Sequence, residues 1–357
     1  MVSHFYLLRQ IHSWVQDAPS IYEKRATGMN SYNNLMPSIA SIDNLRLAYK
    51  KTAKAKKMTF GFLEFKEYKE PNLKAIQEEL LDGSYKIGQY RHFTIYEPKP
   101  RLVSALDFKD RLVQHALVGI IEPIFEATFL PNTFACRVNL GTHAGVRYIQ
   151  SELRKPTENQ YYLKTDFSKF FPSVDHNILL EMIARKITCK QTFDLITEIV
   201  KPNEVGIPIG SLTSQLFANV YGSKLDNFIH HKLGYRKWAR YMDDVVILSD
   251  DLSKLKETFL QIKDFANKNM KLDISKWHCQ STKKGINFLG YRIWDTHKLI
   301  RKDSATRAKR KIAKYVKYQD NLSLDKFLAS WRGHAQWADS HNLFNWLEKK
   351  YETNYQY

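Results

Sequence analysis

The chain has 357 residues, enough for two or three lobes around a sizeable core, which excludes a small disulfide-stapled scaffold. Its formal net charge of +18 favours a polyanionic partner, and nucleic acid is the first expectation. Aromatic residues make up 13% of the chain, which provides the apolar surface needed to fold and excludes an intrinsically disordered protein.

Three cysteines, Cys136, Cys189 and Cys279, are widely spaced and form no Cys-x-x-Cys pair. They indicate neither a zinc site nor a disulfide framework. The apolar run at residues 5–8 is too short for a signal peptide. No apolar run approaches the ~18 residues of a membrane span. We therefore expect a cytoplasmic protein in a reducing compartment, with no membrane partner.

Three regions follow one another along the chain. Residues 1–100 are rich in lysine and carry mixed short signals, such as the strand-like run 93–96. From about 101 to 295, helical periodicity alternates with β-rich runs, which predicts a mixed sheet with helices packed on it. Those runs are 161–165, 238–241, 245–248 and 288–293. From about 296 onward the pattern is helical, which predicts a compact terminal lobe.

Two adjacent acids, Asp243 and Asp244, lie between the predicted strands 238–241 and 245–248. The run Tyr241-Met242-Asp243-Asp244 lies between strand-like segments, so the two strands should form a hairpin with adjacent acids at its tip. Neighbouring carboxylates repel each other unless a cation lies between them, so a divalent ion is a natural partner. An ordinary acidic turn is the alternative.

A third acid, Asp166, follows the run 161–165 and precedes Phe167. If that strand lies beside the hairpin, the three carboxylates would hold two Mg²⁺ ions about 4 Å apart, as in-line phosphoryl transfer requires. The alternative is that Asp166 only caps a helix beginning near Ser168.

A helix is expected at Ser304–Lys317, because apolar residues recur there on one face. That face carries Ala305, Ala308, Ile312 and Tyr315, and the basic residues lie largely on the other face. Between Lys298 and Lys317, nine basic residues stand against one acid. Release of counterions would therefore dominate binding of nucleic acid by this helix. A merely solvated amphipathic helix is the alternative.

Several short blocks occur in the order and spacing of reverse transcriptase motifs. They are Lys99-Pro100-Arg101, residues 110–114, residues 134–137 with 141–143, Asp166 with Phe171, residues 206–215, residues 241–244 and residues 288–291. From about residue 40 the chain therefore resembles a reverse transcriptase. Most group II intron and retron enzymes carry a Gln-Gly-x-x-x-Ser-Pro box. The segment from Ile209 to Gln215 instead resembles the variant box of diversity-generating retroelements.

The resemblance implies an α+β right-hand polymerase with fingers, a mixed-sheet palm and a helical thumb. It divides the chain into an N-terminal extension (1–40), fingers and palm (41–295) and a thumb (296–357). The implied function is RNA-directed DNA synthesis that makes adenine-mutagenic cDNA from a template-repeat RNA, in mutagenic retrohoming. The implied partners are a structured template RNA, the cDNA, dNTPs and a pentameric accessory variability determinant protein.

The resemblance also assigns the metal site and the triphosphate site. Asp166, Asp243 and the backbone carbonyl of Phe167 would ligate two Mg²⁺ ions, with Asp244 supporting them. Arg101, with Lys99 two residues before it, would grip the triphosphate, because a guanidinium fork suits paired phosphate oxygens. A surface arginine without this role is the alternative.

Further roles follow from the same resemblance. Phe171 would collide with a ribonucleotide 2′-hydroxyl, although a core aromatic would look the same. The segment from Ile209 to Gln215 would line the nucleotide pocket, against the alternative of an ordinary glycine-bearing turn. The primer grip would be formed by Phe288, Leu289 and Gly290. The residues contacting nucleic-acid phosphates would be Arg307, Arg310, Lys311 and Lys314. Lys276 is a hypothetical general acid for pyrophosphate, with a solvated lysine as the alternative.

Two rival functions stay open. One is a group II intron or retron type of reverse transcriptase. Only 113 residues follow Asp244 (357 minus 244), so we expect no maturase, nuclease or RNase H domain, and no Val-Thr-Gly of the retron type occurs. The other rival is a non-catalytic RNA-binding relative, against which the presence of all three carboxylates argues.

Overall fold

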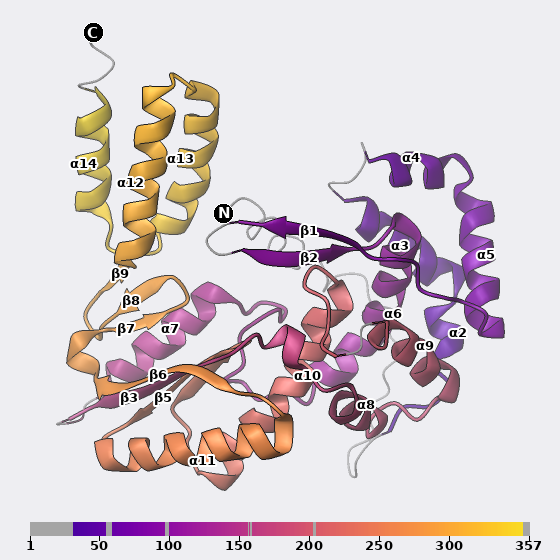
Figure 1. Cartoon of the computed structure of the whole chain (residues 1–357), viewed down its shortest axis with the longest axis horizontal. Coiled ribbons are helices and arrows are strands. Elements are labelled where there is room, and N and C mark those ends of the chain that lie inside the picture. The colour runs from indigo at the N-terminus through magenta and orange to yellow at the C-terminus, as the bar shows by residue number, and fades with distance from the viewer. Residues whose placement is uncertain are drawn as a thin grey trace.

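The computed structural model describes residues 31–54, 59–96, 100–155, 157, 159–202 and 205–352. Lys99 and residues 1–30 of the expected N-terminal extension therefore lie outside the described residues. Figure 1 shows three groups of elements in a mixed α+β arrangement. We call them the fingers (residues 36–105), the palm (residues 108–300) and the thumb (residues 302–352).

The fingers contain four helices and a hairpin: α2 (Met36–Ile39), α3 (Ile42–Ala53), α4 (Phe60–Glu67), α5 (Lys69–Asp82), β1 (Arg91–Ile95) and β2 (Arg101–Ala105). The palm helices are α6 (Phe108–Glu126), α7 (Thr142–Leu153), α8 (His176–Ala184), α9 (Lys190–Val200), α10 (Leu212–Asn227) and α11 (Leu252–Met270). Single helical turns occur at η1 (Phe171–Ser173), η2 (Phe228–Lys232) and η3 (Thr282–Lys284). The palm strands are β3 (Tyr161–Phe167), β4 (Trp238–Tyr241), β5 (Asp244–Ser249), β6 (Ile274–Ser281), β7 (Ile286–Phe288), β8 (Tyr291–Ile293) and β9 (Lys298–Ile300), and the thumb holds α12 (Lys302–Lys317), α13 (Asn321–Ala335) and α14 (His341–Glu352).

The main sheet of the palm has four antiparallel strands in the order β4-β5-β3-β6. The strands predicted at 161–165, 238–241 and 245–248 are thereby confirmed, and so is the hairpin between the last two. β3 lies beside β5, as the interpretation of the three acids required. The sheet therefore brings residues 166 and 243–244 to one end.

Side chains at alternate positions of these strands point to opposite faces of the sheet, and each face has its own hydrophobic core. Leu163 of β3 and Ile247 of β5 join the larger core, which continues into α10 and α11. Tyr162 and Val246, one residue away, join a second core with α7 and the β7–β8 hairpin. Figure 1 accordingly shows α7 and α11 on opposite sides of the sheet. Because the side-chain period in a strand is two residues, both faces are buried by separate layers.

The fingers are held to the palm by α6, which packs against α3 and α10. Leu45, Leu73 and Leu117 are fully buried in this helical layer. The strand-like run predicted at 93–96 forms part of β1, which pairs antiparallel with β2. Figure 1 shows this hairpin extending from the helical fingers toward the thumb. Most of its side chains are exposed, so the hairpin presents both strands to solvent.

The prediction of helix from residue 296 onward is wrong for its first residues. Residues 298–300 form β9, which pairs with β8 to complete a three-stranded sheet. The run predicted at 288–293 is also divided, because Leu289 and Gly290 have φ values of +51° and +90° and turn the chain between β7 and β8. Alternating buried residues from Ile286 to Ile300 favour these short strands over a helix.

The predicted helix at 304–317 is confirmed as part of α12. Ala308 and Ile312 are buried against α13, as the periodicity indicated, and Ala305 and Tyr315 are half-buried. No helix in the described ranges combines the length and apolarity needed to cross a membrane.

Candidate functional site

Three carboxylates converge where β3 ends and β5 begins. Asp166 is the cross-strand partner of Asp244, and Asp243 lies in the turn that leads into β5. The backbone N–H of Phe167 donates a hydrogen bond to the carbonyl of Asp243, with an N–O distance of 3.3 Å. The structure therefore brings together the acids that the sequence analysis singled out. All three side chains are partly exposed.

The turn that carries Asp243 has an unusual backbone. Tyr241 and Asp244 are paired, so Met242 and Asp243 form a two-residue turn. Met242 has a φ of +54°, which is uncommon for a residue other than glycine but suits the first position of a tight hairpin turn. Its side chain is buried. A strained turn of this kind persists only where its surroundings hold it in place.

A buried ion pair supplies that support. Arg240 Nε and Nη2 each donate to one carboxylate oxygen of Asp226, and both N–O distances are 2.7 Å. Arg240 Nη1 donates to the carbonyl of Met242 at 3.2 Å. The side chains of Arg240 and Asp226 are 1% and 0% exposed. A Cβ atom at Gly222 would lie 2.5 Å from the guanidinium carbon, so this glycine makes room for the arginine.

Burial and mutual repulsion determine the electrostatics of the carboxylates. Burial is the main cause that raises the pKa of Asp243, and the charge of Asp166 raises it further, whereas Arg101 and Lys164 oppose the shift. Burial likewise raises the pKa of Asp244 to about 6, against the lowering effect of Lys164. Repulsion between the carboxylates contributes to both shifts, and a cation between them would remove that repulsion.

Lys164 is a residue of this site that the sequence analysis missed. Its Nζ donates to Asp244 Oδ2 at 2.9 Å and to the backbone carbonyl of Asn287 at 2.7 Å. The signal was available, because Lys164 lies two residues before Asp166 and therefore on the same face of β3.

The donors present suit a divalent cation whose shell the substrate completes. Among the described residues, no three His, Cys, Asp or Glu side chains form a ready-made metal cluster. Mg²⁺ is usually held by one or two carboxylates together with substrate phosphates, rather than by a cage of protein ligands. Asp166 and Asp243 provide such carboxylates. Asp244 Oδ1 is buried with no hydrogen-bond partner and is a further oxygen of the same kind.

Arg101 lies near the carboxylates from the fingers side. It is the first residue of β2 and is exposed. Its charge is close enough to lower the pKa of Asp243. A basic group is therefore held opposite the carboxylates by a strand of the fingers.

The segment from Ile209 to Gln215 is joined to the same strand. The carbonyl of Ile209 accepts a hydrogen bond from the N–H of Ser104 in β2 at 2.8 Å. Gly210 has a φ of +109°, and a Cβ atom there would lie 2.8 Å from Val103. Ile209 itself is half-buried, and so is Gln215 in the first turn of α10. The segment therefore contacts β2, the strand that carries Arg101, and its pocket-lining role stays a prediction.

Gln114 supports this segment from beneath, and sequence reasoning assigned it no role. Its Oε1 accepts hydrogen bonds from Ser211 Oγ at 2.9 Å and from the N–H of Leu212 at 3.3 Å. The side chain is buried in α6. The sequence analysis included Gln114 in the motif block 110–114 without giving it a task.

The expected nucleotide and primer residues differ in their exposure. Phe171 is half-buried in η1 and lies edge-on to Phe170, with ring centroids 6.0 Å apart. Phe288 is fully buried in the second core. Leu289 and Gly290, which form the turn of the β7–β8 hairpin, are half-buried. Only these turn residues of the expected primer grip have exposed surface.

The basic residues expected to act on phosphates also differ in their exposure to solvent. Lys276 is exposed and lies directly across from Asp166, on β6. In α12, Arg307, Arg310 and Lys314 are exposed. Lys311 is half-buried, and its Nζ lies 5.3 Å from the ring centroid of Phe327. Lys311 therefore packs on the thumb as well as carrying charge.

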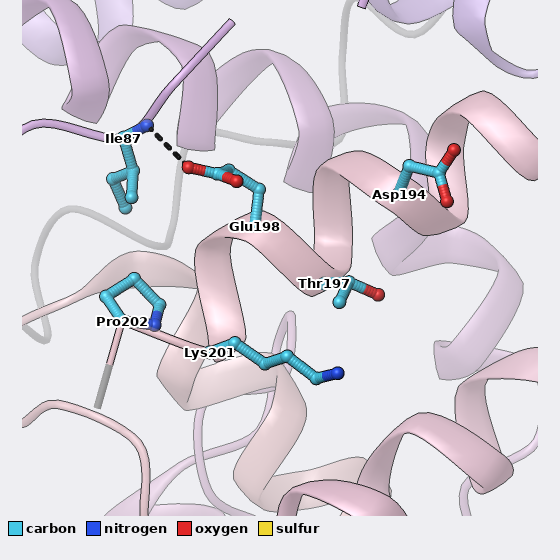
Figure 2. Close-up of a pocket in the computed structure, with 6 residues that line it drawn as sticks. All are labelled: Ile87, Asp194, Thr197, Glu198, Lys201 and Pro202. Atoms are coloured by element: carbon cyan, nitrogen blue, oxygen red, sulfur yellow. Dashed lines mark hydrogen bonds between the residues drawn. The ribbon is translucent and has the colours of Figure 1, made fainter. Parts of the chain in front are cut away.

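A separate pocket of about 430 Å³ lies on α9, away from the carboxylates. Figure 2 shows its six lining residues, with Glu198 accepting a hydrogen bond from the N–H of Ile87. Asp194 and Lys201 lie on the same helix and its end. None of the three converging carboxylates lines this pocket, so the candidate site is the carboxylate cluster.

Comparison with known proteins identifies relatives. A family model described as "Reverse transcriptase (RNA-dependent DNA polymerase)" matches residues 96–293, more than half of the chain. The chain is 26% identical over 178 residues to "Protein YkfC" of Escherichia coli strain K12, covering 45% of this chain and 46% of that protein. It is 26% identical over 175 residues to "Group II intron-encoded protein LtrA" of Lactococcus lactis subsp. cremoris, covering 45% and 29%.

A third relative is "Retron Ec73 reverse transcriptase" of Escherichia coli, 27% identical over 158 residues, with 40% of this chain and 50% of that protein covered. The aligned parts thus span half or less of the length of these three relatives. Among solved structures, an apo telomerase from Candida tropicalis aligns at 11% identity with a TM-score of 0.47, covering 59% of this chain and 48% of that chain.

Proposed function

The chain belongs to the reverse transcriptase family, and from that premise we propose that it is an RNA-directed DNA polymerase. The observation that carries the proposal is the convergence of Asp166, Asp243 and Asp244 at one end of the palm sheet. Partly exposed carboxylates with a basic residue of the fingers beside them suit a nucleotidyl transfer site.

The residues of the site have distinct proposed roles. Asp166, Asp243 and the Phe167 carbonyl would hold two Mg²⁺ ions, with Asp244 in support. When bound, these ions would activate the primer 3′-hydroxyl and neutralise the leaving pyrophosphate. Arg101 would orient the triphosphate by paired hydrogen bonds to its oxygens. Lys276, exposed across the sheet from Asp166, would hold a proton for the leaving group.

We propose the same division of the chain that the resemblance implied. Residues 1–40 would be the extension, 41–295 the fingers and palm, and 296–357 the thumb. These boundaries place α2 in the extension and β9 in the thumb, whereas the grouping given above places α2 with the fingers and β9 with the palm. The thumb helices begin at Lys302. Met36 and Ile39, within the extension, are buried in the larger core. The extension is therefore continuous with the fingers at its C-terminal end.

The type of reverse transcriptase is proposed from the segment around Ile209. An Ile-Gly-Ser-Leu-Thr-Ser-Gln box supports an enzyme of a diversity-generating retroelement, which makes adenine-mutagenic cDNA from a template-repeat RNA. Its partners would be that structured RNA, the cDNA, dNTPs and the pentameric accessory variability determinant protein, in the cytoplasm. The net charge of +18 supports a nucleic-acid partner.

A second candidate type is favoured by the relatives, which include a group II intron-encoded protein and a retron reverse transcriptase. Sequencing cDNA made by the purified protein on a defined RNA separates the two types. Errors concentrated opposite template adenines support the retroelement enzyme. An even, low error rate at all four bases supports the second candidate.

Ile209→Gln is expected to raise fidelity opposite template adenine more than opposite the other bases, while extension persists. A pocket that holds a nucleotide by shape alone discriminates by only ~1–3 kcal/mol, whereas an unpaired polar group rejects a misfit more strongly. The measurement is the error spectrum of the cDNA, with Ile209→Leu as the apolar control. An identical adenine error rate in Ile209→Gln and wild type would place the cause of infidelity elsewhere.

Replacing Arg307, Arg310, Lys311 and Lys314 by Gln is expected to weaken RNA binding. The log–log slope of affinity against salt should fall by about 0.7–0.9 for each phosphate that the variant no longer neutralises. Because Lys311 rests over Phe327, the triple variant that keeps Lys311 should show most of this change. Binding is measured by fluorescence anisotropy over a range of salt concentrations.

A matched control for the triple thumb variant replaces three exposed lysines of α11 by Gln. They are Lys256, Lys263 and Lys268. This helix covers the face of the palm sheet opposite α7 (Figure 1). Its variant should leave the slope unchanged. Equal slopes in the thumb variant and the wild type would show that α12 does not contact phosphates.

A further inference from the structure

Lys164 connects two hairpins that are far apart in the sequence. Its Nζ donates to Asp244 Oδ2 in the β4–β5 hairpin and to the carbonyl of Asn287 in the β7–β8 hairpin. The two distances are 2.9 Å and 2.7 Å. Because the side chain is only 14% exposed, the ion pair is screened less than a surface pair. The ammonium group is therefore held between fixed acceptors.

The position of Lys164 follows from the register of the sheet. It pairs with Val246 of β5 and His278 of β6 in the middle of the four strands. Tyr162, two residues earlier, lies in the second core, and Asp166, two residues later, lies in the carboxylate cluster. Since i and i+2 share a face, Lys164 stands at the boundary between the apolar layer and the carboxylates.

The β7–β8 hairpin itself joins the palm to the thumb. A Cβ atom at Gly145 of α7 would lie 2.9 Å from Leu289 Cδ1, so the hairpin turn packs tightly on that helix. The Tyr291 hydroxyl donates to the carbonyl of His334 in α13 at 2.9 Å. The Gly290 carbonyl accepts from the N–H of Arg301 at 3.1 Å. The turn and β8 therefore connect β7 to the thumb, so a shift of β7 would change these contacts with α13 and with Arg301 at the start of α12.

We propose that Lys164 is a positioning residue that couples the carboxylate site to the β7–β8 hairpin. A cation beside Asp244 changes the position and charge of the group to which Lys164 is bound, and the second hydrogen bond transmits that change to the Asn287 carbonyl. The turn of this hairpin carries Leu289 and Gly290, which the resemblance assigns to the primer grip. A hairpin held in place by a bound divalent ion would favour binding of the primer terminus. Because energetic coupling between two sites is reciprocal, the bound primer would favour the ion by the same factor. The inference rests on the proposed function.

The test measures this coupling without catalysis. The dissociation constant of a dideoxy-terminated primer on RNA is determined with and without Mg²⁺, in the absence of dNTPs. In wild type, Mg²⁺ should tighten primer binding by about fivefold or more, the usual lower range of coupling between sites. In Lys164→Met this factor should fall to near one. An undiminished factor in Lys164→Met would overturn the proposal.

Two variants serve as references. Lys109→Met removes an ion pair of similar length between α6 and α5, with 2.7 Å between Lys109 Nζ and Glu79 Oε1, and should keep the wild-type factor. Lys164→Arg keeps a cation that donates to two acceptors, so it should restore part of the coupling. Loss of coupling in Lys109→Met as well would mean that the effect is not specific to Lys164, and would overturn the proposal.

If Lys164→Met fails to fold, a measurement on the wild-type protein can still contradict the proposal. Hydrogen–deuterium exchange of residues 286–293 should slow when Mg²⁺ is added. Exchange that is insensitive to Mg²⁺ would overturn the proposal. Primer extension by the same wild-type preparation tests the proposed function separately. Extension together with unchanged exchange refutes only the role of Lys164, whereas absent extension refutes the proposed function.

Discussion

Asp243→Asn is expected to reduce Mg²⁺-dependent extension of a primer on RNA by roughly 100-fold or more, because metal-ion catalysis supplies several kcal/mol. The fold should remain intact. The side chains have the same shape, and the amide removes the repulsion from Asp166 that helps to raise the pKa of Asp243. The melting temperature should therefore equal or slightly exceed that of wild type, which separates loss of activity from loss of structure.

The control for this variant is Asp250→Asn, which changes an exposed acid just beyond the other end of β5. It makes the same chemical change close in the sequence but away from Asp166. Both variants are compared by single-nucleotide incorporation and by thermal unfolding. Near wild-type incorporation in Asp243→Asn would remove Asp243 from the metal site.

The second large effect is expected on stability. Arg240→Met leaves the carboxylate of Asp226, at 0% exposure, buried without its positively charged partner, and only the Thr133 hydroxyl among its side-chain donors remains. Breaking one side of a buried ion pair costs about 3–5 kcal/mol of unfolding free energy. The loss should be visible as a lower midpoint in urea denaturation. Because Arg240 also holds the Met242 carbonyl, any folded fraction should bind Mg²⁺ and extend primers less well.

A surface pair provides the comparison. Arg185, just past the C-terminal end of α8, places its Nη2 2.6 Å from Oε1 of Glu181 in that helix, and both side chains are about two-thirds exposed. Arg185→Met should lower the urea midpoint far less than Arg240→Met does, because solvent screens an exposed pair. Replacing both buried partners, by Arg240→Met with Asp226→Leu, should cost less than Arg240→Met alone. Equal losses in Arg240→Met and Arg185→Met would contradict the account of the buried pair.

The parts of the site that the sequence predicted are those with a local pattern. Tyr241 to Asp244 between two apolar runs indicated a hairpin, and the structure has it with the acids at the turn. The β-rich run before Asp166 indicated a strand, and that strand pairs with β5. Both features depend on short runs of β-favouring residues, which are visible in the order of residues alone.

The parts that could not be predicted depend on contacts between distant segments. Asp226 meets Arg240 only because α10 packs beside β4, and Lys276 lies opposite Asp166 only because β6 takes the edge of the sheet. The helical pattern after residue 296 did not reveal the strand at 298–300. That strand is only three residues long, and it forms because it pairs with β8, which lies earlier in the chain. Tertiary pairing decides such short segments.

The measurement that tests the central claim most directly is extension of a DNA primer annealed to a defined RNA by purified wild-type protein. Reactions contain dNTPs with Mg²⁺, with ribonucleotides in place of dNTPs, or with EDTA in place of Mg²⁺. The account predicts a DNA product complementary to the RNA, formed only with dNTPs and a divalent ion. No product with any RNA template, or a product that forms in EDTA, would contradict it.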